Sequence, residues 1–152
     1  MGGELSHRPA APVPAPGGEG TLRPAVATVR RVDFGSVSLC TEDGEPFEAT
    51  VRGRLMGRRK SLGNAVVVGD RVRLEWEGER AVVEEVEPRR SSFSRRAAGE
   101  RDEEQVVAAN LDQVVIVAAL RRPEFRHGFV DRVLAQAFHD RLPALLALNK
   151  PD

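Results

Sequence analysis

The pattern of apolar residues changes once along the chain, and this change limits the folds that are open to it. From Ala25 to Glu87, apolar and polar residues alternate in short runs separated by turn residues. Further on, 112–120 (DQVVIVAAL) and 144–148 (ALLAL) are continuous apolar runs. Alternation is typical of strands with one buried face, whereas continuous runs are typical of parallel strands buried on both faces. The sequence therefore predicts a β-rich unit followed by part of an α/β unit.

Five strands are expected in the first unit. Their ranges are 25–32, 36–41, 46–53, 70–76 and 80–87. The turn dipeptides Asp43-Gly44 and Glu77-Gly78 predict two hairpins. Five short strands without a long helix favour a small closed barrel of the OB type over residues 25–88. An SH3-like barrel is the alternative.

The remaining segments differ in composition. Residues 1–24 hold five prolines and five glycines and predict a disordered tail. The polar, charged stretch 89–106 has no period and predicts a linker. In 107–152, a helix is expected between the two apolar strands, and strand, helix and strand form a right-handed crossover. The apolar face of this helix comprises Phe129, Val130, Val133, Leu134, Ala137 and Phe138. Two strands and one helix cannot cover both faces of a sheet, so the α/β unit is incomplete as written.

Composition excludes several classes of protein. The single cysteine, Cys40, excludes an internal disulfide, and with only three histidines no zinc cluster is expected. No apolar run reaches the ~18–20 residues that span a bilayer, and no secretory signal precedes the barrel. We therefore expect a cytoplasmic protein without a membrane partner and with no metal site of its own.

The most informative motif is Asn-Lys-Pro-Asp after the second apolar strand. In open α/β sheets, ligands bind beyond the carboxyl ends of strands, where Asn149, Lys150 and Asp152 are expected. Asp152 could accept two hydrogen bonds from the N1–H and exocyclic amine of guanine, a pair that adenine does not offer. The Lys150 stem could lie over the base while its charge stays in solvent. The alternative is an ordinary polar turn; we favour guanine recognition.

The usual companions of this motif are missing from the chain. A phosphate loop reads G-x-x-x-x-G-K-[ST], and the nearest match, residues 53–61 (GRLMGRRKS), has arginine before its lysine and lies within the barrel. No Asp-x-x-Gly occurs either. Most nucleotide affinity comes from phosphate contacts, so we expect no catalytic residue, no GTP hydrolysis and at most very weak guanine nucleotide binding from this chain alone.

Arginines gather at two places in the barrel unit. All but two of the 23 basic residues are arginine, which suits planar contacts to phosphate. The candidate RNA-contacting residues are Arg52, Arg54, Arg58, Arg59, Lys60, Arg89, Arg90, Arg95 and Arg96. Basic clusters beside an aromatic residue, here Phe93, suggest contact with an RNA backbone. The alternative is a solvated loop and linker. Because the turn at 75–80 (EWEGER) is mostly acidic, any RNA contact is expected from the other two segments.

Five stretches together resemble a known family. They are VGDRV (68–72), RRSSFSRR (89–96), VAANLDQVVIVAA (107–119), FVDRVLAQA (129–137) and LPALLALNKPD (142–152). The chain resembles the RsgA (YjeQ) family of circularly permuted GTPases, which assist late maturation of the small ribosomal subunit. The resemblance covers about residues 25–152.

The resemblance implies an order of parts that accounts for the missing phosphate loop. In the family an OB barrel comes first, the guanine-reading motif precedes the phosphate loop, and a zinc-binding domain comes last. It further implies GTP hydrolysis with Mg²⁺ at the phosphates. The small ribosomal subunit and its rRNA are the implied partners and stimulate the reaction, and the protein is expected to be monomeric. Only Asn149, Lys150 and Asp152 can be matched to family site residues; the zinc ligands and hydrolytic residues have no counterpart here, and relative to the family the chain stops about halfway. The alternative is a stand-alone OB-fold RNA- or ribosome-binding module without enzymatic activity.

Overall fold

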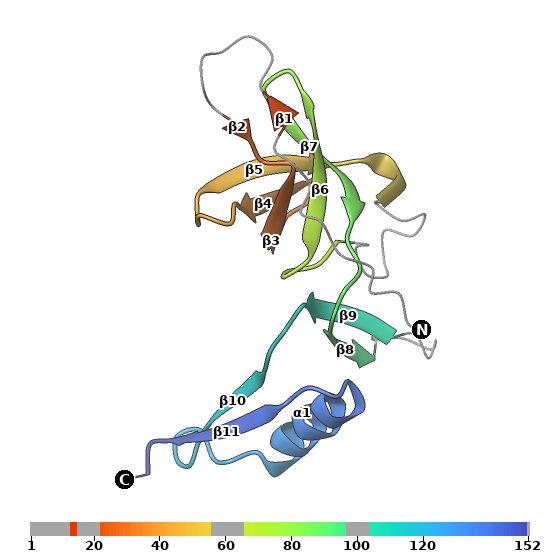
Figure 1. Cartoon of the computed structure of the whole chain (residues 1–152). Helices are drawn as coiled ribbons and strands as arrows, with labels where there is room; N and C mark the ends of the chain where they lie inside the picture. Colours follow the sequence, from red (N-terminus) through yellow and green to blue (C-terminus); the bar gives the residue numbers. More distant parts are fainter. Residues whose placement is uncertain (1–12, 15–21, 56–65, 97–103, 152) are drawn as a thin grey trace, which may run out of the picture.

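The computed structural model describes residues 13–14, 22–55, 66–96 and 104–151. Figure 1 shows a barrel, a short hairpin next to it, and a strand–helix–strand unit on the far side of the hairpin. The three parts follow one another in sequence, so the hairpin connects the other two. In these ranges no helix combines the length and the hydropathy needed to cross a membrane.

Five strands close into the barrel, in the order β3-β4-β5-β7-β6. Their bounds are β3 (Val26–Val32), β4 (Ser36–Cys40), β5 (Pro46–Val51), β6 (Arg71–Glu77) and β7 (Arg80–Val86). The pair β5–β7 is parallel, and the other four pairs are antiparallel. A five-stranded Greek-key barrel with this pairing is the OB fold and not the SH3-like alternative. The predicted strands thus form the predicted barrel.

The barrel core follows from the alternation seen in the sequence. Val29, Val37, Leu39, Val72 and Val83 are completely buried, and in β3, β4 and β6 buried positions alternate with more exposed ones over most of the strand. A row of β-branched and leucine side chains packs well on a pleated surface, and each buried side chain of this size stabilises the fold by about 1.5–3 kcal/mol.

The tail predicted to be disordered contains a short pair of strands. Strands β1 (Val13–Pro14) and β2 (Leu22–Arg23) pair in antiparallel fashion. Arg23 lies over the ring of Trp76, 4.8 Å from the ring centroid, and the Trp76 indole N–H donates to the Pro24 carbonyl at 3.0 Å. These four positions therefore form a strand pair, and at Arg23 and Pro24 an aromatic residue of the barrel contacts the chain.

The segment predicted as a linker, 89–106, contains regular structure. It includes strand β8 (Ser92–Arg96) and the first half of strand β9 (Glu104–Ala109), which pair in antiparallel fashion. Polar side chains bond across the pair: Arg95 donates to Gln105, and Ser94 contacts Glu104. Strands held by cross-strand polar pairs show no hydrophobic alternation, so the pattern missed them.

The last part is the predicted crossover. It consists of β10 (Val114–Ala119), α1 (His127–His139) and β11 (Ala144–Asn149), and the two strands are parallel from the pair Val114–Ala144 to the pair Ala119–Asn149. In Figure 1 the helix lies on one side of the strand pair.

One face of this unit is therefore covered and the other is not. Ile116, Val130 and Ala137 are buried, whereas Val117 is 65% exposed and Phe138 is 86% exposed. The helical face predicted from the sequence is thus only partly buried, since the described residues supply a single helix for two strands.

Candidate functional site

The carboxyl end of β11 carries the predicted base-reading residues. Asn149 is the last residue of the strand, beside Ala119 at the end of β10, and its carbonyl accepts the Leu120 N–H at 2.9 Å. The Asn149 side-chain oxygen accepts the backbone N–H of Lys150 at 2.9 Å, and Lys150 turns into the left-handed region with φ 56°. The chain therefore leaves the sheet at the edge where ligands bind in open α/β folds.

Lys150 is fixed across this edge. Its ammonium group donates to the backbone carbonyl of Arg122, in the segment between β10 and α1, at 2.9 Å. Although the residue is exposed, its ammonium group is therefore held by a backbone carbonyl across this edge. Asp152 lies outside the described residues. The structure thus brings Asn149 and Lys150 together and leaves the position of the third residue as a prediction.

No phosphate-binding loop accompanies the base-reading motif in the sequence. The full sequence contains no G-x-x-x-x-G-K-[ST] loop, and the segment that comes nearest begins in the short 3₁₀ turn η1 (Gly53–Leu55), which follows barrel strand β5. That turn belongs to the barrel and not to the strand ends that carry Asn149. Of the family nucleotide site, only the base-reading edge has matching residues here.

Arg52, predicted to contact RNA, is used within the barrel instead. Its guanidinium forms ion pairs with Glu75, Glu77 and Glu84, on the hairpin of β6 and β7. The acidic turn noted in the sequence therefore has a partner from the neighbouring strand end. These carboxylates neutralise the charge of the Arg52 guanidinium, so we remove Arg52 from the proposed RNA contacts.

Arg89 and Arg90 also have partners within the chain. Arg89 donates two hydrogen bonds to the buried carboxylate of Asp70, at 2.7 and 2.9 Å, and this pairing raises the pKa of the arginine. Arg90 pairs with Asp112 at 2.7 Å, and its hydrogen bond and charge lower the pKa of that exposed carboxyl group. Since the first pair is buried and bidentate, we assign Arg89 a structural role and remove it from the proposed RNA contacts.

The other predicted RNA contacts are less constrained. Arg95 donates to the neutral side-chain oxygen of Gln105, so its charge is not cancelled by that partner. Nothing is described for Arg58, Arg59 and Lys60, nor for the side chains of Arg54 and Arg96.

Phe34, at the tip of the first barrel turn, is not among the residues that the sequence pattern predicts to contact RNA. This residue lies between β3 and β4, flanked by Asp33 and by Gly35 with φ 84°, and it is 94% exposed. Arg31, three residues before Phe34 in the sequence, pairs with Asp33 at 2.7 Å. The loop between the first two strands is one of the two loops that OB folds use to bind oligonucleotides. An aromatic residue between two turn residues, in the first hairpin of an expected OB barrel, was the signal.

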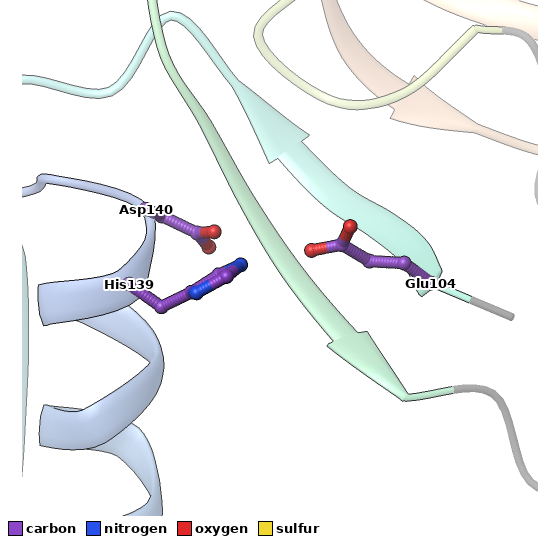
Figure 2. Close-up of side chains that lie close together, drawn as sticks. All are labelled: Glu104, His139 and Asp140. Atoms are coloured by element: carbon purple, nitrogen blue, oxygen red, sulfur yellow. The ribbon is translucent and has the colours of Figure 1, made fainter. Parts of the chain in front are cut away.

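A separate group of potential ligand atoms lies where the helix meets the hairpin. Glu104, His139 and Asp140 each offer one atom, and these atoms lie within 4.8 Å of one another (Figure 2). Asp140 accepts the Ser94 backbone N–H at 2.9 Å and the Gln136 amide at 3.1 Å. Glu104 and His139 are exposed, and the hydrogen bonds of Asp140 are those of a helix end held on a strand. We therefore interpret the group as the attachment of α1 to β8.

The comparisons with known proteins agree with this arrangement. Residues 86–152 match the family model described as RsgA GTPase. The chain is 39% identical over 116 residues to the small ribosomal subunit biogenesis GTPase RsgA of Gemmatimonas aurantiaca, covering 74% of this chain and 37% of that protein. It is 40% identical over 116 residues to the RsgA 2 protein of the same description from Bacteroides thetaiotaomicron, covering 74% and 36%.

A solved structure shows the same fold. The crystal structure of YloQ, a circularly permuted GTPase, aligns with a TM-score of 0.54 and 18% identity over 81% of this chain and 39% of that one. This likeness shows the fold, an OB barrel followed by a strand–helix–strand unit, and in the present chain the sequence after the last strand contains Asn-Lys-Pro-Asp. The chain belongs to the RsgA family, and it spans little more than a third of the length of the relatives it matches.

Proposed function

We propose that the chain contributes the RNA-contacting barrel and the guanine-reading edge of a GTPase that acts on the small ribosomal subunit. The relatives are named for biogenesis of that subunit. The observation that carries the RNA contact is Phe34, a nearly fully exposed aromatic residue on the first loop of an OB barrel. On this proposal GTP and Mg²⁺ act in the whole protein, with the phosphates bound by residues that this chain does not contain, and Asn149, Lys150 and Asp152 read the base.

The charges of the barrel refine the surface that meets RNA. Glu75 and Glu77 lie on the β6–β7 hairpin and pair with Arg52, so these carboxylates and the Arg52 guanidinium offset each other's charge on this side. We place the contact instead on the β3–β4 turn with Phe34, together with Arg95 and the basic residues 58–60. Stacking on a phenyl ring needs no particular base, which suits a protein that recognises the shape of a folded RNA.

Phe34→Ala is expected to weaken binding of the chain to small ribosomal subunits. One base stacked on an aromatic ring is worth about 1–3 kcal/mol, which corresponds to about a 5- to 150-fold loss of affinity. Co-sedimentation of the purified chain with small subunits measures this loss. Phe138→Ala is the matched control, because Phe138 is 86% exposed but lies on α1, outside the barrel. Equal affinities for the two variants would remove Phe34 from the interface.

The purified 152-residue chain is expected to show no GTP turnover above background. Hydrolysis depends on groups that hold the phosphates and orient water, and none of the matching motifs occurs in the sequence. Phosphate release at saturating GTP and Mg²⁺ measures the activity, with buffer alone as the reference. Turnover that follows the protein through purification would contradict this assignment of parts.

A further inference from the structure

The turn that precedes β6 is the point where the barrel meets the hairpin. Asp70 has no exposed surface, and its carboxylate accepts three hydrogen bonds. One comes from the Val67 backbone N–H at 2.8 Å, and two come from Arg89, which follows the last barrel strand. The Asp70 carbonyl also accepts the Val29 N–H of β3 at 2.8 Å. Asp70 therefore ties the turn to a barrel strand and to the chain that leaves the barrel.

Strand β9 runs directly against the same turn. The Ala109 N–H donates to the Val68 carbonyl at 2.9 Å, and Val68 bridges Ala108 in parallel fashion. A Cβ atom on Gly69 would lie 2.1 Å from the Ala109 carbonyl oxygen, so only glycine allows this approach. The turn and the strand are thus in backbone contact without an intervening side chain.

Asn110 closes the joint from the hairpin side. Its side-chain amide donates to the Gly69 carbonyl at 2.8 Å, and its side-chain oxygen accepts the Arg90 N–H at 2.9 Å. Its own backbone N–H donates to the Ser91 carbonyl at 2.8 Å, and its backbone has φ 55°. One side chain therefore bridges the barrel turn and the segment that leads into β8.

The connection from this joint to the base-reading edge is short. Strand β10 begins at Val114, only a few residues after Asn110. The intervening residues are held as well, because the Ser91 hydroxyl donates to the Leu111 carbonyl at 2.6 Å and Arg90 pairs with Asp112. Strand β10 then extends away from the hairpin to the edge shared with Asn149 (Figure 1).

We infer that Asp70, Arg89 and Asn110 are positioning residues that make the barrel and the strand–helix–strand unit one rigid body. This inference rests on the proposed function, in which the barrel binds RNA. The joint then sets the orientation of the guanine-reading edge relative to that RNA. Subunit contact on the barrel then places the nucleotide site at a defined orientation without a hinge between them. None of the three residues touches the base or the RNA in this assignment.

Backbone ¹⁵N relaxation of the whole chain tests this rigidity. In the unsubstituted protein, amides of the barrel strands and amides of α1 and β10 are expected to report one rotational correlation time. Asn110→Ala and Arg89→Lys each remove part of the bridge, the second because lysine lacks the bidentate fork. In both variants the two groups of amides are expected to report different correlation times, while their chemical shifts remain those of folded units. Asp33→Asn, which removes the exposed partner of Arg31 in the β3–β4 turn, away from the joint, is the control and is expected to keep a single time.

Hydrogen–deuterium exchange provides the second readout at low protein concentration. Asn110→Ala is expected to lose amide protection at Ala109, whose N–H contacts the barrel turn, while strands β3 to β5 keep theirs. A merely stabilising role would change the unfolding midpoint without separating the two correlation times. Two times in the unsubstituted chain, or one time in both bridge variants, would overturn the inference. Since no RNA or nucleotide is present, either result leaves the proposed function to its own tests.

Discussion

Asp70→Ala is expected to lower the free energy of unfolding of the barrel by about 3–5 kcal/mol, the cost of breaking a buried ion pair by removing one partner. The substitution removes the carboxylate that accepts two hydrogen bonds from the Arg89 guanidinium, which is only 26% exposed. It also leaves the Val67 N–H without its acceptor. Few single substitutions at charged residues have effects of this size, since most such residues are exposed.

Urea denaturation followed by the fluorescence of Trp76, the single tryptophan of the chain, measures this loss in the barrel itself. Asp112→Ala is the matched control, because it also removes an aspartate paired with an arginine. That pair is exposed, with side chains 60% and 83% accessible, and such pairs contribute about 0–1 kcal/mol. Equal destabilisation by the two substitutions would show that the Asp70 pair is not the buried anchor described here.

Gly69→Ala is expected to be the second strongly destabilising change. A non-glycine residue at φ 87° costs about 1–3 kcal/mol, and the new methyl group must also displace the Ala109 carbonyl oxygen, 2.1 Å from its ideal position. The free energy of unfolding is expected to fall by more than backbone strain alone explains, and the contact between turn and hairpin is expected to be lost.

Gly44→Ala separates the two causes. Gly44 has φ 92°, nearly the same backbone conformation, but nothing lies within 4 Å of an added Cβ. It therefore reports backbone strain without a clash. The difference between the two variants in the same urea titration measures the steric part, and no difference would mean that turn and strand do not approach as closely as the structure shows.

The barrel and the crossover could be predicted because their strands and helix carry a hydrophobic period. Val29, Leu39 and Val72 each lie at alternating positions that point to one core, so pattern alone places them. Ser94 and Arg95 carry no such period, and their strand forms through pairing with residues about ten positions away. The hydrophobic pattern along one strand contains no information about a polar partner on another strand. This explains why the pattern predicts a linker where the structure has a hairpin.

In the candidate site, the sequence alone also could not show which charged residues are paired. A count of arginines treats Arg52, Arg89 and Arg95 alike, but the structure gives the first two carboxylate partners and the third a neutral one. Which arginine is available to RNA depends on acids brought near by folding, and these lie 19 or more residues away in the two neutralised cases. Asn149 and Lys150 could be placed from sequence because a motif directly after a strand needs no distant partner.

Co-sedimentation of the unsubstituted chain with purified small and large ribosomal subunits tests the central claim most directly. The account predicts binding to small subunits that weakens as salt is raised, because arginines release counterions from RNA, and little binding to large subunits under the same conditions. Equal binding to both subunits, or no binding to small subunits even at low salt, would contradict it.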